Sequence, residues 1–218
     1  MRVLFVLSLV MFAACDKPVE PTTTSSGDEP RVAPESATTQ PSAAAESQRG
    51  WQEVAESTLD DVQRAQLAKA SSAQQALGKT LLGALTASIG ERGFAQSVEF
   101  CRGAAPDMAE KVGAEHGIAI GRTSHKLRNP QNAPPEWAAQ TVASKDGGKH
   151  HFAGSDGSLG VLTPIMTAEL CTKCHGGPDA LADGVEAALT EKYPDDEATG
   201  FAVGELRGWF WVEVPGPS

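Results

Sequence analysis

The stretch Trp209-Phe210-Trp211-Val212-Glu213-Val214, near the C-terminus, is the segment of the 218-residue chain that most strongly indicates the fold. Alternate side chains of a β-strand point to opposite faces of a sheet, and here both sets contain large apolar residues. The pattern predicts a strand packed on both faces. Its aromatic side chains are expected to belong to the core or to line a ligand pocket.

Three further strand candidates lie upstream of this stretch. Residues 150–153 and 160–165 are expected to pair across the turn Gly154-Ser155-Asp156-Gly157, and residues 118–123 form another candidate. A turn at 128–132 and a short helix at 135–143 complete this region. The sequence therefore predicts an antiparallel sheet in the C-terminal half.

The segment before these strands is helical in composition and periodicity. Residues 51–91 are rich in Ala, Leu, Gln, Lys and Glu, and their apolar residues recur at helical intervals. Gly93 is the expected stop, and a second helix is expected from Phe94 to about Glu115 despite Pro106. Helices first and an antiparallel sheet second define the fold class as α+β.

The pentapeptide Cys171-Thr172-Lys173-Cys174-His175 has the spacing of a c-type haem attachment site. The two sulfurs, Cys171 and Cys174, add across the haem vinyl groups as thioethers, and His175 binds the iron from one face. The motif predicts one covalent haem c, and the iron needs a sixth ligand from elsewhere in the chain.

A Cys-x-x-Cys pair has two other common explanations. A thioredoxin-type dithiol follows a strand in a βαβ pattern and opens a helix, whereas this pair is expected in a small loop before Gly176-Gly177-Pro178. A tetrahedral zinc site needs a second ligand pair, and the only other cluster is His150-His151. We favour haem attachment over both.

The N-terminus resembles a bacterial lipoprotein signal. It has a positive start at Arg2, an apolar run at 3–12 too short to cross a bilayer, and the processing site Ala13-Ala14-Cys15. Lipidation of Cys15 after cleavage would anchor the protein on the periplasmic side of a bacterial membrane. The alternative is an ordinary secretory signal with an unmodified Cys15, which preserves the exported location that haem c attachment requires.

Composition divides the chain into three parts. Residues 1–14 are the expected signal peptide, residues 15–50 a disordered tether rich in Pro, Thr, Ser and Ala, and residues 51–218 one haem domain. Removing residues 1–14 takes the formal charge from −10 to −11, because one Arg and no acid are lost. This charge argues against binding to nucleic acid or to an anionic bilayer surface. The lipid is therefore the only membrane contact that we expect.

Cys101 is left without an intramolecular disulfide partner once Cys15 is assigned to lipid and Cys171 and Cys174 to haem. An odd thiol in an exported protein needs an explanation. The spacing leaves three open: a buried core thiol, an intermolecular disulfide, or the sixth ligand of the haem iron.

Several segments, taken in order, resemble a family of exported c-type haem domains. That family was first catalogued as a domain of unknown function and is also found at the sensory end of bacterial signalling proteins. The resemblance spans about residues 70–215. Its segments are Glu99-Phe100-Cys101, Ala105-Pro106, the run IGRTSHKLRNPQNAP at 120–134, CTKCHG at 171–176, YPDDEATGF at 193–201, and Leu206-Arg207-Gly208.

The resemblance implies a PAS-like fold and an iron held by a histidine on one side and a cysteine sulfur on the other. By its position in Glu99-Phe100-Cys101, that cysteine is Cys101. Other candidates for the sixth position are Met166, either histidine of the pair His150-His151, and an open or water-bound iron. His116 and His125 lie in polar, turn-rich stretches and are expected to be solvated.

Three arginines lie within the segments that carry the resemblance, namely Arg122, Arg128 and Arg207. A guanidinium suits bidentate pairing with a haem propionate, and the alternative for each arginine is an ordinary ion pair. Lys126 and Asn129 are weaker candidates for the same role.

Two functions fit these features. The first is a membrane-tethered mono-haem c-type cytochrome with His/Cys ligation that transfers single electrons at low potential, because a thiolate stabilises ferric iron. The second is a haem-based redox or gas sensor, in which reduction releases Cys101 and opens the iron to a small gas. No kinase, cyclase or methyl-accepting segment follows residue 218, so a sensor would need a separate partner protein. No feature beyond the haem suggests an enzyme, and we expect none.

Overall fold

The structure is a computed structural model that describes residues 50–217. The expected signal peptide, most of the expected tether, and Cys15 lie outside these residues. The division of the chain into signal, tether and haem domain therefore stays a prediction.

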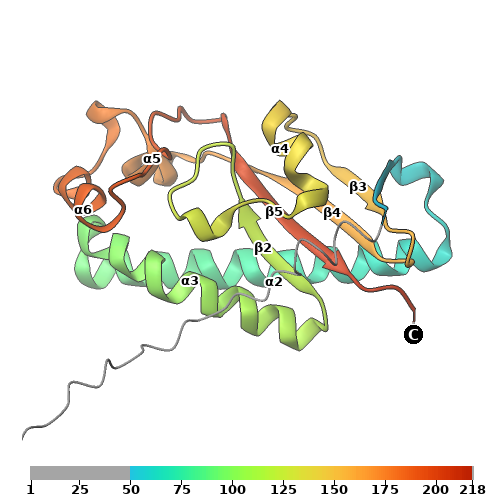
Figure 1. The fold of residues 1–218 in the computed structure, drawn as a ribbon. Coiled ribbons are helices and arrows are strands. Elements are labelled where there is room, and N and C mark those ends of the chain that lie inside the picture. Colours follow the sequence, from blue (N-terminus) through green and yellow to red (C-terminus); the bar gives the residue numbers. More distant parts are fainter. Residues whose placement is uncertain (1–49, 218) are drawn as a thin grey trace, which may run out of the picture. The chain divides into compact units, whose positions relative to one another are not determined.

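Within residues 50–217 the central feature is a five-stranded sheet in which every pair of neighbours is antiparallel (Figure 1). The order across the sheet is β1-β3-β4-β5-β2. The strands are β1 (Gln52–Val54), β2 (Ala119–Thr123), β3 (His150–Ala153), β4 (Leu159–Met166) and β5 (Leu206–Val214). The predicted hairpin is confirmed as β3 and β4, and long helices precede β2 to β5, as the α+β, PAS-like prediction required.

Two long helices, α2 (Asp61–Arg92) and α3 (Phe94–His116), lie on the same side of the sheet (Figure 1). Gly93, with φ 81°, ends the first and begins the second, because its left-handed backbone breaks the helical path that other residues favour. Pro106 lies inside α3. The predicted stop at Gly93 and the predicted second helix are both confirmed.

The predicted start of the first helix at residue 51 is wrong. Residues 52–54 form β1 and pair with β3 at the edge of the sheet, and a 3₁₀ turn, Glu56–Thr58, follows. Asp60 then starts α2 through a capping box: its carboxylate accepts from Gln63 N at 2.8 Å, and Gln63 Oε1 accepts from Asp60 N at 3.1 Å. Pairing with β3 outweighs the helical composition of the residues before Asp60.

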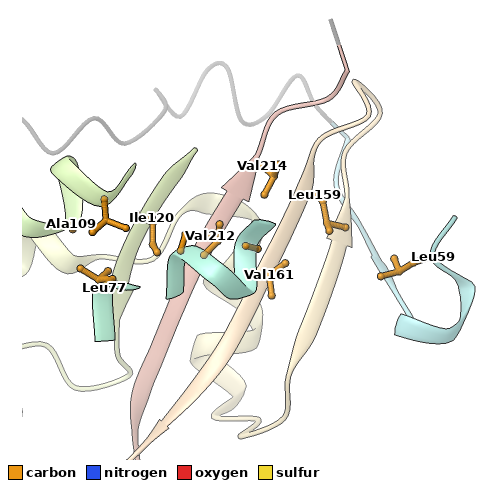
Figure 2. Close-up of a cluster of buried hydrophobic side chains, with 11 residues drawn as sticks. Leu59, Leu77, Ala109, Ile120, Leu159, Val161, Val212 and Val214 are labelled. Atoms are coloured by element: carbon orange, nitrogen blue, oxygen red, sulfur yellow. The ribbon is translucent and has the colours of Figure 1, made fainter. Parts of the chain in front are cut away.

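Strand β5 has a buried layer on each face, as its alternation predicted. On the helix side, Val212 and Val214 join Leu77 of α2, Ala109 of α3 and Ile120 of β2 in one apolar cluster, together with side chains of β4 (Figure 2). On the other side, a second cluster contains tryptophan and phenylalanine side chains. Its buried members are Trp137, Ala138, Val142, Phe152, Leu162, Trp209 and Trp211.

The remaining helices are short, and one of them covers the second face of the sheet. The predicted helix at 135–143 is a 3₁₀ turn, Glu136–Ala138, continued by α4 (Ala139–Ser144). The others are α5 (Glu169–His175) and α6 (Val185–Lys192), and α6 packs against α3 through a third buried cluster. Among residues 50–217 there is no helix with the length and apolar character needed to cross a membrane.

Candidate haem site

A cavity of about 250 Å³ lies where α2, α3, α5 and the ends of β2, β4 and β5 meet. Residues from widely separated parts of the sequence line it, and they include every site residue predicted within 50–217. These are Cys101, Arg122, Arg128, Cys171, Cys174, His175 and Arg207.

The rest of the lining is mostly apolar and comes largely from the two long helices. A haem is a flat apolar ring with an iron at its centre and two carboxylates at one edge, so its site needs apolar walls, axial donors and cations. The cavity offers all three, and its residues therefore fit the group. Its apolar side chains are Leu82, Leu85, Ile89, Phe94, Val98, Pro106, Leu127, Ile165 and Leu170.

The haem motif itself forms helix α5 and does not lie in a loop as predicted. Cys171 and Cys174 are three residues apart on this helix, which places them about one turn from each other. Burial raises the pKa of the Cys174 thiol to about 11. A thioredoxin-type dithiol depends on a lowered thiol pKa and on a βαβ setting, and this sheet is antiparallel in residues 50–217. The structure therefore gives no support to a redox dithiol.

His175, the last residue of α5, is held by the backbone of the segment that precedes β5. Its Nδ1 lies 2.7 Å from the carbonyl oxygen of Ala198. A carbonyl can only accept, so Nδ1 carries the proton and Nε2 keeps its lone pair. Arg207 Nε lies 3.2 Å from the same Nδ1, but a protonated nitrogen cannot accept from it, and the shorter contact decides the tautomer. Burial and the nearby guanidinium of Arg207 hold the pKa of His175 well below its usual value. The ring is thus neutral, as an iron ligand must be.

Cys101 lies on α3 and faces the same cavity as the haem motif. Burial raises the pKa of its thiol, while Arg122 and Arg128 act in the opposite direction. The neutral thiol is therefore favoured until a cation such as iron is bound to the sulfur. The sequence left three explanations for Cys101 open. Its position in the cavity agrees with two of them, a core thiol and an iron ligand.

The three candidate arginines differ in what they contact. Arg128 pairs with the buried carboxylate of Asp196, with Nη2 to Oδ2 at 3.0 Å. Arg207 donates from Nη1 to Ser124 Oγ at 2.9 Å, and its guanidinium carbon lies 5.2 Å from the centre of the Phe201 ring. Arg122 makes no hydrogen bond or ion pair within residues 50–217, and burial lowers its pKa. Within the described residues, Arg128 is therefore the only one of the three that pairs with a carboxylate, the partners of Arg207 are uncharged, and Arg122 has no hydrogen-bond partner.

Lys126 and Asn129, the weaker candidates for contact with a propionate, also differ in their positions and partners. Lys126 is absent from the cavity lining and donates from Nζ to the Thr199 carbonyl at 3.1 Å. Asn129 lines the cavity, but its side chain accepts from Gln131 N at 3.0 Å and caps a 3₁₀ turn.

The competing sixth ligands do not line the cavity. Met166 is 51% exposed at the end of β4. His150 lies 2.7 Å from Glu53 Oε1, and His151 is buried beside β1 with Nε2 3.6 Å from Glu56 Oε2. His116 is the last residue of α3 and is half-buried. Geometry therefore favours Cys101 over all of these residues.

Of the two alternatives for the aromatic side chains of β5, membership of the core is confirmed, and one expectation about a histidine needs correction. Trp209 and Trp211 belong to the core on the second face of the sheet and do not line the cavity, nor does Phe210. His125 was expected to be solvated, but its ring is half-buried, 5.8 Å from Phe201 and 6.1 Å from Trp209 between ring centres. Edge-to-face packing between aromatic rings accounts for this position.

The sequence interpretation missed three residues that complete the site. Tyr193 lines the cavity, and burial raises its pKa to about 12. Ala198 supplies the carbonyl that accepts from His175, and Asp196 pairs with Arg128. All three lie in the segment 193–201, which carries part of the family resemblance. That resemblance is the sequence feature that could have pointed to them.

Fold and site together define an α+β domain in which a haem-type Cys-x-x-Cys-His helix closes a mostly apolar cavity. The chain matches the family described as Tll0287-like over residues 38–215 and belongs to that family. It is also similar to a solved structure titled "Crystal structure of the cyanobacterial heme-protein Tll0287", with a TM-score of 0.54 and 24% identity. That match covers 70% of this chain and 96% of the other and shows a shared fold. A search of curated proteins finds no match.

Proposed function

We propose that the cavity holds one c-type haem, attached through Cys171 and Cys174, with His175 and Cys101 as axial ligands. The observation that carries the proposal is that these four residues, drawn from α3 and α5, line one cavity. Membership of the Tll0287-like family supports it, because the cyanobacterial protein Tll0287, whose fold the chain shares, is a haem protein.

When bound, the haem supplies a single-electron redox centre. Each protein group then has a defined task. His175 offers the Nε2 lone pair of a neutral ring whose orientation the Ala198 carbonyl fixes. Cys101 offers a sulfur that favours the ferric state when it is a thiolate and so lowers the potential. The apolar side chains of α2 and α3 exclude water from the ring. Arg122 and Arg207, neither of which pairs with a carboxylate within residues 50–217, offer cations to the propionates.

We infer that the protein transfers single electrons on the periplasmic side of a bacterial membrane, anchored through a lipid on Cys15 and without enzymatic activity. A c-type haem requires export, and the first 15 residues have the pattern of a lipoprotein signal. The partner would be a redox protein that reaches the tethered domain.

A sensor is the second candidate function, and the environment of Cys101 favours it. Burial raises the pKa of this thiol, and a protonated thiol binds iron poorly, so reduction of the iron would favour release of Cys101. Release would leave a coordination position for a small gas and would change the contacts of α3. The signal would then pass to a separate partner protein.

Absorption spectra of the haem-loaded protein test the ligand set and separate the two functions. Ferric and ferrous spectra are recorded for wild type, Cys101→Ala and the control Met166→Leu, with carbon monoxide added to each ferrous form. A thiolate signature that disappears only in Cys101→Ala is expected. Carbon monoxide uptake by the ferrous wild type would favour the sensor, and its absence would favour electron transfer. An unchanged Cys101→Ala spectrum would overturn Cys/His ligation.

A further inference from the structure

Asp196 is a buried carboxylate whose two oxygens serve two different parts of the chain. Oδ1 accepts from the backbone N–H of Ala198 at 2.8 Å. Oδ2 accepts from Arg128 Nε at 3.1 Å and lies 3.0 Å from Nη2. The Asp196 and Arg128 side chains are only 7% and 12% exposed, so water screens this pair poorly.

Arg128 extends this arrangement to the haem motif. Its Nη2 donates to the carbonyl of Cys174 at 2.6 Å and also lies 3.3 Å from the carbonyl of Ala198. The Ala198 oxygen therefore contacts two donors, the Nδ1–H of His175 and the guanidinium of Arg128. One ion pair thus fixes both the helix that carries the motif and the carbonyl that orients its histidine.

The segment that carries Ala198 has no regular secondary structure, so its position depends on such contacts. Glu197 N donates to the Leu127 carbonyl at 2.9 Å, and Phe201 N donates to the His175 carbonyl at 2.9 Å. Between these two points, Asp196 and Arg128 hold Ala198, which is fully buried. Within residues 50–217, the only other side chain that hydrogen-bonds to the Ala198 peptide is the His175 ring itself, so the ion pair is what positions this peptide for the histidine.

We propose that Asp196 and Arg128 are positioning residues for the axial histidine. They act through the Ala198 carbonyl, which sets the tautomer, ring orientation and basicity of His175. The inference rests on the proposed function, because Asp196 and Arg128 act on a histidine that is proposed as a haem ligand. Removing such outer partners of metal-binding histidines typically costs roughly 10–100-fold in metal affinity or activity.

The variant Asp196→Asn tests this role, with Asp195→Asn as a matched control. Both changes remove one negative charge, but Asp195 is exposed whereas Asp196 faces Arg128. Asparagine keeps an oxygen for the Ala198 N–H and places an NH₂ group against the guanidinium donors. The readouts are the reduction potential and the ferric electron paramagnetic resonance spectrum of the haem-loaded protein.

We expect Asp196→Asn to retain covalent haem and to alter the ferric g-values. The loss of a buried negative charge about 10 Å from the iron, at an effective dielectric constant of about 20, should also shift the ferric/ferrous equilibrium constant by roughly tenfold toward the ferrous form. Asp195→Asn should change neither readout. Equal behaviour of the two variants would overturn the inference. If Asp196→Asn does not accumulate, Arg128→Lys serves instead: it keeps the charge but loses the planar fork, and unaltered g-values in this variant would overturn the role. A wild-type protein without covalent haem would instead refute the proposed function.

Discussion

Gly121 of β2 lies directly opposite Trp211 of β5, and the two residues are in such close contact that a Cβ on Gly121 would lie 2.6 Å from the indole ring. The indole fills the space where another residue would have a side chain. This contact lets a fully buried tryptophan pack across the edge strand that also carries Arg122.

Gly121→Ala is expected to destabilise the protein, because the added methyl group overlaps a buried ring that has no room to move. Overpacking of this kind costs about 1–3 kcal/mol. Gly83→Ala is the matched control, since no heavy atom lies within 4 Å of its Cβ position in α2 and alanine favours helix by about 1 kcal/mol. Chemical denaturation should show opposite shifts for the two variants. Equal midpoints would contradict the close contact.

Arg122→Gln is expected to lower the reduction potential of the haem-loaded protein, because a buried cation favours the electron-rich ferrous state. For a charge about 10 Å from a redox centre, an effective dielectric constant of about 20 gives about 1.7 kcal/mol, or more than roughly tenfold in the equilibrium constant. Spectroelectrochemistry measures the shift. Arg102→Gln, an exposed arginine on α3, is the control. A shift of the same size in both would show that Arg122 has no special relation to the haem.

His151 is expected to make stability fall in mild acid. It is 3% exposed, and burial lowers its pKa. The unfolded chain therefore takes up a proton near pH 6.5, before the folded protein does, and stability is lost as the pH falls below that value. Denaturant titrations between pH 7.5 and 5 should give a steeper loss for wild type than for His151→Gln. Parallel curves would mean that His151 is protonated equally in both states.

Cys15→Ser is expected to release the haem-loaded protein from the membrane fraction without changing its absorption spectrum. The thiol would carry the lipid, and serine cannot receive it through a thioether. Fractionation of cells that express either form measures the distribution. Retention of Cys15→Ser in the membrane would show that another segment or partner provides the attachment.

Local pattern predicted the elements whose signals are strong. The alternation of 209–214 predicted a strand with two buried faces, and Gly93 predicted the break between the long helices, because both depend on neighbours along the chain. The predicted start of the first helix was wrong because residues 52–54 pair with β3, about a hundred positions away in the sequence. Such pairing leaves no local signature.

The sequence predicted those site residues whose function requires a particular side chain. It did not predict the residues that contribute only a backbone group. The spacing of Cys171, Cys174 and His175 predicted haem attachment from the sequence alone. The family resemblance favoured Cys101 as the sixth ligand of the iron. Ala198 contributes only a carbonyl, which any residue could supply. Asp196 acts by accepting a hydrogen bond from the Ala198 backbone, so its role can be recognised only once the fold is known.

The convergence of α3 and α5 on one cavity has a consequence for the topology of the chain. If the proposed haem is covalently fixed to α5 and its iron is bound to Cys101, the cofactor would be a cross-link that closes the loop between residues 101 and 175. A cross-link restricts the unfolded ensemble, as a disulfide does, and its effect grows with the length of the loop. In the sensor that we propose as the second function, this link would open on reduction and close on oxidation, unlike a disulfide, so each electron would change the mechanical connectivity of the domain.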